Sequence, residues 1–205
     1  MDLSGGLINL NSIPIYYEKS RYSLTKKEVN CIKKIEYYNT EPGLYLSISD
    51  SVLQNKELKN FKKFIVEKAE AYVKNILEIK NQIYLTQSWS TLSKTNASHR
   101  PHSHPNTFIS LVYYAHAEEG KLFFDIRTSS LKDCFNFDYS ISNYNIYNSE
   151  EWAIHVKSGD IVIFPGHICH GSTPNKSKRN RITMGANFFI KGTLGSKKRL
   201  SLIKI

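Results

Sequence analysis

The sequence predicts an α+β protein in which helices come first and a β-rich second half folds as a sandwich or barrel. Two observations carry this prediction. Apolar residues recur at helical spacing over a long stretch before residue 81, whereas the chain beyond Gln82 breaks into short β-rich runs separated by turn-forming residues. With 205 residues, 40% of them hydrophobic, the chain is long enough to bury a core as a single domain, residues 1–205.

The first expected elements are an edge strand and a short helix. Leu7–Tyr17 alternates loosely between apolar and polar residues, and its Pro14 suits an edge strand, where fewer backbone donors are needed. The segment from Thr25 to Glu28 matches a capping box, in which a hydroxyl and a carboxylate satisfy the free amides of a helix start. We expect this helix to end near Tyr38, before Pro42 and Gly43 break the pattern.

A second short strand is expected at Leu44–Ser49, and the strongest helix at Ser51–Lys80. Apolar residues such as Leu58, Phe61 and Ile65 share one face of this helix, while lysines and glutamates occupy the other. We interpret it as a packing helix that backs a sheet, without a role in chemistry. Residues 1–81 are thus the N-terminal strand and supporting helices.

The β-rich half, residues 82–192, is expected to be the core of the protein and contains one insertion. The insertion, residues 128–151, is rich in tyrosine and asparagine and either lines a substrate pocket or packs on its own rings. Residues 193–205 form a basic tail. The expected strands are Ile83–Leu92, Thr107–Ala115, Lys121–Ile126, Trp152–Val156, Asp160–Phe164 and Arg181–Ile190.

Composition narrows the class of protein. There is no run of 18 apolar residues, so we expect no transmembrane helix, and the N-terminus lacks the layout of a signal peptide. Cys31, Cys134 and Cys169 are odd in number and far apart, which favours a reducing, cytoplasmic setting over a disulfide framework. The net charge of +10 comes mainly from lysines spread along the chain, so a nucleic-acid partner stays open but is not favoured.

Three histidines and an arginine point to a metal site. His102 and His104 are two residues apart, so both project to one face of an extended strand, and His170 comes much later, at the end of another apolar run. Imidazoles bind a borderline metal such as iron and leave positions open for oxygen and a cosubstrate. Arg181, a short loop beyond His170, offers a planar fork for a carboxylate, unless it forms an ordinary salt bridge to an Asp or Glu.

The other histidines give weaker signals. His99 and His167 lie outside the strand register and either orient a ligand or are solvated. His116 and His155 have no partners nearby in the sequence, so we interpret them as structural or exposed.

Further short motifs accompany these residues. They are Ser88-Trp89, His102 to Thr107, Ser110 to Tyr114, Gly120 to Asp125, Gly159 to Pro165, His170-Gly171, Pro174-Asn175 and Arg181 to Phe188. Together they resemble the iron(II)- and 2-oxoglutarate-dependent oxygenases of the double-stranded β-helix, or jelly-roll, fold, and in particular the branch common in marine bacteria and tailed phages. The resemblance covers roughly residues 83–190 and is specific for the superfamily rather than for a substrate.

The resemblance implies a jelly-roll core backed by N-terminal helices, with Fe(II), 2-oxoglutarate and O2 as cofactor and cosubstrates. It also implies that His102 is the first metal ligand, that His170 is the distal one, and that Arg181 pairs with the 5-carboxylate of 2-oxoglutarate. The implied reaction converts 2-oxoglutarate to succinate and CO2 and usually hydroxylates an unactivated C–H bond, here of an unknown substrate. Strand residues that can face the pocket, one of which we expect to bind the cosubstrate, are Ser110, Tyr113 and Asn187.

The sequence departs from the family motif at His104. The usual motif is His-x-Asp or His-x-Glu, so this histidine stands where a carboxylate ligand is usual. Three arrangements remain open: His104 is the third ligand, an acid from elsewhere such as Asp125 completes the site, or the protein supplies two ligands only. We favour the set His102, His104 and His170.

Two other functions remain open. A cupin-like metal-dependent enzyme or small-molecule binder would use a similar β scaffold and three histidines, but it would need no inward arginine at Arg181. A catalytically lapsed scaffold would account for the missing carboxylate and the positive charge. The oligomeric state, a homodimer included, is not fixed by the sequence.

Overall fold

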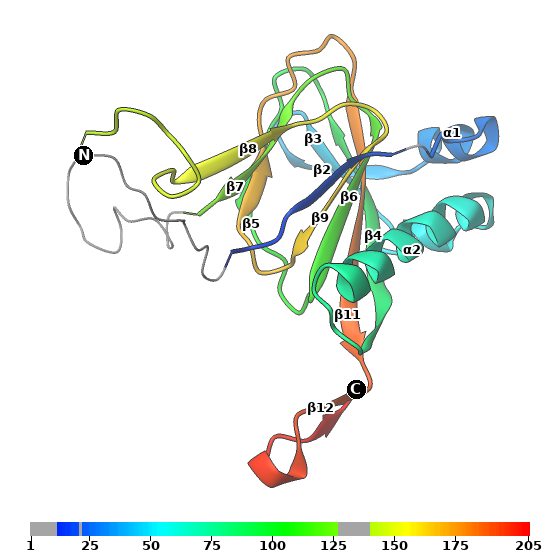
Figure 1. Ribbon diagram of the computed structural model, residues 1–205. Coiled ribbons are helices and arrows are strands. Elements are labelled where there is room, and N and C mark those ends of the chain that lie inside the picture. The colour runs from blue at the N-terminus through cyan, green and yellow to red at the C-terminus, as the bar shows by residue number, and fades with distance from the viewer. Residues whose placement is uncertain (1–11, 21, 127–139) are drawn as a thin grey trace.

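The computed structural model describes residues 12–20, 22–126 and 140–205, and within these ranges two antiparallel sheets face each other (Figure 1). This two-sheet arrangement confirms the predicted sandwich or jelly-roll core. Each of the six predicted β-rich runs contains a strand. The expectations for residues 7–11 and 128–139 lie outside the described residues.

The larger sheet has seven strands and the smaller sheet four. The order in the larger sheet is β1 (Tyr16–Lys19), β9 (Asp160–Pro165), β6 (Ile109–His116), β11 (Arg181–Lys191), β4 (Gln82–Ser93), β3 (Leu44–Ser47) and β2 (Tyr37–Glu41). The order in the smaller sheet is β5 (His99–His102), β10 (His170–Ser172), β7 (Lys121–Asp125) and β8 (Glu151–His155). The strand β11 is therefore central, paired with β4 on one side and β6 on the other.

The two predicted helices are present, with corrected boundaries. The first is α1 (Lys26–Lys33), and its capping box is confirmed because Thr25 and Glu28 satisfy each other's backbone amides. It does not reach Tyr38, since Tyr37–Glu41 forms β2 and pairs with β3 across a turn in which Gly43 has a φ of +76°.

The second helix is α2 (Lys59–Asn75), shorter than the predicted stretch of residues 51–80. The missing N-terminal part forms two 3₁₀ turns, η1 (Val52–Gln54) and η2 (Lys56–Leu58). The second turn starts where the Asn55 side chain accepts from the amide of Glu57 at 2.9 Å, a local bond that competes with a continuous helix.

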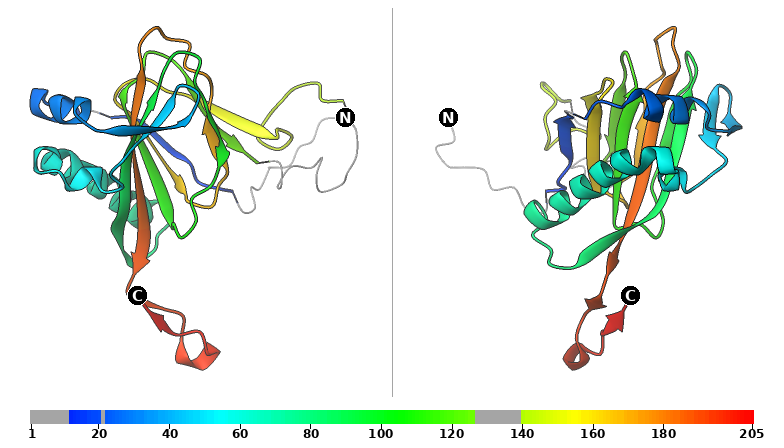
Figure 2. Two further views of the ribbon diagram at one scale, coloured as in Figure 1. Left: turned by 180° about the vertical axis from the view of Figure 1, so that it is seen from behind. Right: turned by 90° about the vertical axis from the view of Figure 1, so that its right-hand side faces the viewer.

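Two apolar clusters hold these layers together. In the first, α2 lies across the outer face of the larger sheet, as the right-hand view of Figure 2 shows, and Phe61 and Ile65 pack with Leu111 and Tyr113 of β6. In the second, the inner faces of the two sheets meet, and the rings of Phe124 and Phe164 lie 5.2 Å apart, edge to face. Both sheets thus contribute apolar side chains to the space between them.

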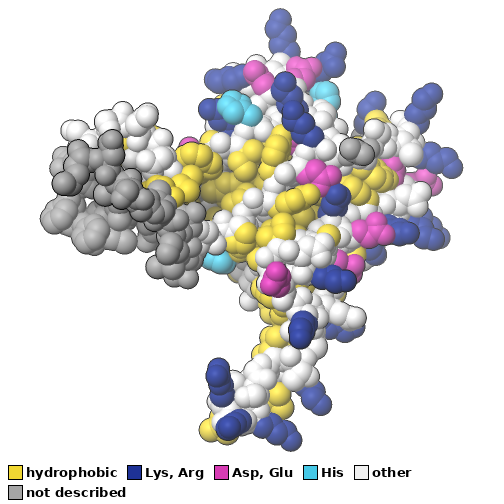
Figure 3. Space-filling model, viewed as in Figure 1, with side chains coloured by type: hydrophobic (Ala, Val, Ile, Leu, Met, Phe, Trp, Pro, Cys, Tyr) yellow, Lys and Arg dark blue, Asp and Glu magenta, His cyan; other side chains and the backbone are white. Residues whose placement is uncertain are grey.

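Beyond β11, the hairpin of β12 (Thr193–Leu194) and β13 (Ile203–Lys204) extends away from the sheets, with η4 (Lys197–Arg199) between the two strands (Figures 1 and 2). Lysine and arginine side chains are spread around the face shown in Figure 3 rather than gathered in one patch. Among the helices of the described ranges, none combines the length and apolar character that a membrane crossing requires.

The packing of α2 predicts a strong effect of Phe61→Ala. This fully buried ring contacts the rings of Tyr22 and Tyr113, so its removal leaves a cavity and should cost about 3–5 kcal/mol of unfolding free energy. Urea unfolding would measure the loss. The control is Lys63→Ala on the same helix, whose exposed ion pair with Glu67 at 3.8 Å should contribute under about 1 kcal/mol. Equal losses for both variants would contradict this account of the helix.

Candidate metal and cosubstrate site

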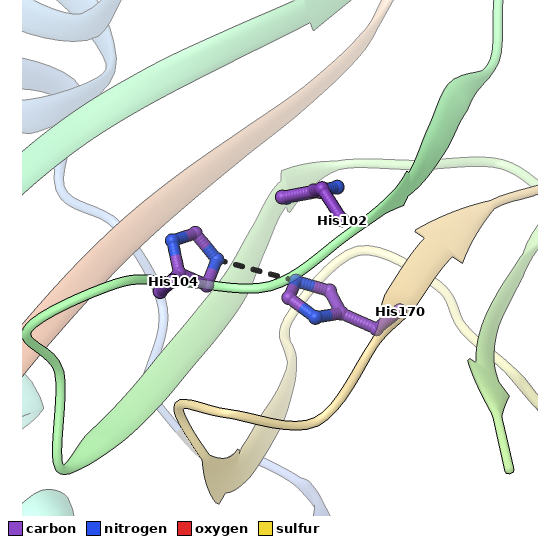
Figure 4. A group of neighbouring side chains, drawn as sticks. All are labelled: His102, His104 and His170. Atoms are coloured by element: carbon purple, nitrogen blue, oxygen red, sulfur yellow. Dashed lines mark hydrogen bonds between the residues drawn. The ribbon is translucent and has the colours of Figure 1, made fainter. Parts of the chain in front are cut away.

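Three imidazoles converge between the sheets, beside the phenylalanine pair, since the ring of His170 lies 4.5 Å from that of Phe164. His102, the last residue of β5, lies directly across the antiparallel ladder from His170, the first residue of β10. His104 follows two residues later and brings its Nε2 to 3.3 Å from His170 Nε2 (Figure 4). The ligand atoms of the three residues all lie within 4.8 Å of one another, so one ion can contact all of them.

The backbone around His104 fixes its place, although the residue lies past the end of β5 and not on the strand as expected. Its amide donates to Gly166 O at 2.9 Å, and the Gly166 amide donates to Phe108 O at 3.0 Å. A side chain at Gly166 would meet Thr107 at 2.6 Å, so this close approach requires glycine. The ring of His104 lies 5.3 Å from the indole of Trp89.

Two of the imidazoles are oriented by backbone carbonyls. His102 Nδ1 lies 2.8 Å from Arg100 O and His170 Nδ1 lies 2.9 Å from Ile168 O. A carbonyl only accepts, so each Nδ1 carries the proton and each Nε2 keeps a free lone pair. This arrangement is typical of metal-binding histidines, whose second nitrogen donates to a carbonyl or carboxylate.

Burial keeps the imidazoles of His104 and His170 neutral. Desolvation, with smaller contributions from neighbouring histidines, lowers the pKa of His104 to about 4 and that of His170 to about 3. The neutral form is the one that binds a metal. The donor set of three neutral nitrogens suits iron, and it suits zinc or nickel as well.

Asp125 does not join this group. Along β7, Leu122 and Phe124 pack in the cluster between the sheets, so the strand period of two turns Asp125 to the other face. Within the described ranges, the cluster of potential metal ligands that includes His102 and His170 is completed by His104. The geometry therefore favours the three-histidine arrangement.

Arg181 lies buried beside the histidines with one donor group unused. Its Nη2 donates to Ser172 Oγ at 2.8 Å and to Thr173 O at 3.0 Å, while Nη1 is buried without a hydrogen-bond partner within the described ranges. Gly120 makes room for it, since a Cβ there would lie 2.7 Å from Nη1. A buried guanidinium with an unpaired donor is destabilising unless an anion accepts a hydrogen bond from it. A carboxylate ligand can supply that acceptor.

A cavity of about 380 Å³ joins these groups. Tyr114 of β6 lines it, is almost fully buried, and has a pKa raised by burial, so its hydroxyl stays protonated. Of the expected cosubstrate-binding residues, Arg181 and Asn187 line the cavity, and Ser110 lies behind Asn187, to which it donates at 2.8 Å. A larger cavity of about 750 Å³ beside α1 is lined by none of these groups.

The expectation that Tyr113 faces the cavity is wrong. Its hydroxyl donates to Tyr22 O at 3.1 Å, and its ring packs against Phe61 on the α2 side of the sheet. The strand period could have revealed this, because Ser110 and Tyr113 are three residues apart and must point to opposite faces, whereas Ser110 and Tyr114 share one. The residue that sequence reasoning missed is therefore Tyr114.

The remaining histidines differ in position. His99 lines the cavity, its ring centroid lies 4.1 Å from that of His102, and burial lowers its pKa to about 4. His167 and His155 are exposed, and His116 is half-buried at the end of β6. Only His99 of these four therefore belongs to the site.

A model of the family described as "Putative 2OG-Fe(II) oxygenase" matches residues 87–187, just under half of the chain. This segment contains the three histidines, Arg181, Tyr114 and Asn187, and oxygenases of this family use Fe(II), 2-oxoglutarate and O2. The match supports a 2-oxoglutarate- and Fe(II)-dependent oxygenase. No curated protein matches the sequence.

Solved structures share the fold at low sequence identity. HygX from Streptomyces hygroscopicus, solved with nickel, 2-oxoglutarate and hygromycin B bound, has a TM-score of 0.59 at 9% identity, over 86% of this chain and 82% of its own. The carbocyclase SnoK from nogalamycin biosynthesis has a TM-score of 0.57 at 10% identity, over 88% and 81%. A 2OG-Fe(II) oxygenase family oxidoreductase from Burkholderia pseudomallei has a TM-score of 0.55 at 5% identity, over 78% and 74%. These likenesses confirm the jelly-roll fold.

The lowered pKa values predict that the metal-free protein loses stability in acid. His99, His104 and His170 bind protons at about pH 6.5 when unfolded but only near pH 3–4 when folded, so the unfolded state takes up more protons below pH 6.5. Their contribution to stability is constant above pH 7 and is lost as the pH falls from 6.5 toward 4. Urea unfolding at several pH values, with metal removed by a chelator, measures this loss.

The matched variant for this test is His99→Gln. It removes one imidazole whose pKa is lowered by folding. Near pH 5 the slope of unfolding free energy against pH should therefore fall by roughly 1 kcal/mol per pH unit relative to wild type. An unchanged slope would show that His99 is solvated in the folded protein.

Proposed function

We propose that this protein is an Fe(II)- and 2-oxoglutarate-dependent oxygenase that hydroxylates an unactivated C–H bond of its substrate. The observation that carries the proposal is the placement of an arginine with one unpaired buried donor beside three converging imidazoles. The arginine suits an anion and the imidazoles suit a metal ion. A cosubstrate that binds both the arginine and the metal must carry a carboxylate at some distance from a chelating end. 2-Oxoglutarate has this form.

His102, His104 and His170 would hold the metal through their Nε2 atoms. The carbonyls of Arg100 and Ile168 hold two of these rings in the required tautomer. Bound there, Fe(II) would supply the activation of O2 that no protein side chain provides. Balanced over the reaction, substrate C–H, O2 and 2-oxoglutarate give the alcohol, succinate and CO2.

Arg181 would pair with the 5-carboxylate of 2-oxoglutarate through the free edge of its guanidinium. Ser172 and Thr173 fix the other edge, so the fork is oriented before the ligand arrives. Tyr114 lines the same cavity and, as a protonated phenol, can donate to the same carboxylate. Asn187 and Ser110 lie on the His104 side of the cavity, so we propose that they support the metal end instead.

The other functions considered fit less well. A cupin-like enzyme would have no use for an inward arginine with an unpaired donor, and a lapsed scaffold would have no reason to keep one. Several narrower expectations remain predictions. They are the likeness to the marine and phage branch, the cytoplasmic setting, the single domain, a homodimer as one possible state, and a nucleic-acid partner that is open but not favoured.

The cosubstrate assignment predicts the outcome of an anaerobic titration of Fe(II) and 2-oxoglutarate. Wild type should develop the weak visible charge-transfer band of the iron chelate, and Arg181→Ala should need about 10- to 100-fold more 2-oxoglutarate to reach it, because a charged hydrogen bond is lost. The control is Arg179→Ala, since this neighbouring arginine is exposed and bonded to Glu118. Iron binding without the band in wild type would favour the cupin-like function instead.

The assignment of His104 as the third metal ligand predicts different Fe(II) affinities for variants at His104 and at Asp125. His104→Ala should lose most Fe(II) affinity in an anaerobic binding titration, because it removes a donor atom, whereas Asp125→Ala should retain it, because the residue points away from the cluster. The reverse result would establish Asp125 as the ligand.

A further inference from the structure

A chain of polar side chains runs through the candidate metal site. Ser110 Oγ donates to Asn187 Oδ1 at 2.8 Å, and Asn187 Nδ2 lies 3.4 Å from His104 Nδ1. On the other side of its ring, His104 Nε2 lies 3.3 Å from His170 Nε2. Ser110, Asn187 and His170 are each 3% exposed or less, so their polar atoms must find partners within the protein.

One fixed end determines the direction of every hydrogen bond in this chain. His170 Nδ1 faces Ile168 O at 2.9 Å, so that nitrogen carries the proton and His170 Nε2 can only accept. His104 must then donate from Nε2, which leaves its Nδ1 to accept from Asn187 Nδ2. The amide oxygen of Asn187 accepts from Ser110, and the chain is satisfied in this one direction.

This direction is incompatible with a metal at His104. The proton on Nε2 occupies the atom that faces the other imidazoles, and a metal needs the lone pair there. The proton must therefore sit on Nδ1, which then needs an acceptor in place of the donor that faces it.

Asn187 can supply that acceptor by turning its amide, because the two orientations fill nearly the same space. Its Oδ1 would then face His104, and its Nδ2 would donate to Ser110, whose hydroxyl both donates and accepts. Gln87 Oε1 lies 3.4 Å from Asn187 Nδ2. Gln87 can turn its own amide as well, so that its Nε2 donates to the Oδ1 that then faces it. Ser110, Asn187 and His104 are thus able to reverse their donor and acceptor roles, while His170 keeps its own.

We propose that metal loading reverses the hydrogen bonds of the chain from Ser110 through Asn187 to His104, and that Asn187 is the positioning residue that sets the tautomer of His104. The inference rests on the proposed metal site and explains how a histidine can serve where a carboxylate ligand is usual. A carboxylate has no tautomer to set, whereas a neutral imidazole does. Because His104 is neutral in both states, the reversal moves a proton from Nε2 to Nδ1 and releases none.

The test uses Zn(II), a diamagnetic probe, with variants at Asn187 in the full chain. Asn187→Asp offers only an acceptor and so should bind Zn(II) at least as tightly as wild type. Asn187→Leu has a similar size but offers no polar atom, so it should bind roughly 10- to 100-fold more weakly, the usual effect of removing a partner of a ligating histidine. Ser90→Ala, at a buried serine of the same sheet outside the chain, should leave the affinity unchanged.

Ring-nitrogen NMR spectra give the second readout. In wild type, His104 should carry its proton on Nε2 without metal and on Nδ1 with Zn(II), while in metal-free Asn187→Asp it should already be on Nδ1. His104→Gln assigns the signals by their loss.

The outcomes separate the two proposals. If wild type fails to bind Zn(II), the metal site and this inference both fall. If it binds while the His104 tautomer stays the same, or if Asn187→Asp weakens binding as much as Asn187→Leu, the metal site stands and the positioning role of Asn187 is overturned.

Discussion

Both the fold and the site depend on the alternation of side chains along β11, the central strand of the larger sheet. A strand has a period of two, so a slip of one residue would bury Arg181 in the apolar cluster and turn Phe188 into the cavity. Pairing with β4 and β6 on both sides excludes that slip. The residues that pack toward α2 are Ile182, Met184, Ala186 and Phe188, and those that line the cavity are Arg181, Thr183, Gly185 and Asn187.

The same strand shows which features could be predicted from the sequence. The alternation of apolar and polar side chains along β11 could be predicted from the sequence. The paired histidines and the strand-end His170 could be predicted too, because each is a local pattern of a few residues. The pairing of His102 with His170 across the β5–β10 ladder was not readable, since it depends on contacts between segments far apart in the chain. The end of α1 at Lys33, earlier than the sequence predicts, has the same origin. Tyr37 forms a hydrogen bond with Ser90 Oγ at 2.8 Å, and the pairing of its strand with β3 is favoured over a longer helix.

The position of His104 was missed for a related reason. A His-x-His pair on an ideal strand predicts two rings side by side, but the strand ends at His102 and the next residues turn. What returns His104 to the cluster is a bond from its amide to Gly166, a residue on the connection that carries His170. The two segments that bear the proposed ligands are therefore held together by a backbone hydrogen bond, with or without an ion between them.

The electrostatics of the site follow from its lack of an acid. Within the described part of the chain, Asp50 is the one carboxylate among the lining residues of the cavity, and it is exposed at the mouth. Three neutral imidazoles would not offset any of the positive charge of a divalent ion. Arg181 would add a further positive charge in the same buried space. A dianion is the ligand that offsets this excess, since its two carboxylates can reach both cations at once. If His104 holds the metal as proposed, the pocket would depend more on an anionic cosubstrate than a site with a carboxylate ligand does, and cosubstrate affinity would depend on the presence of the metal.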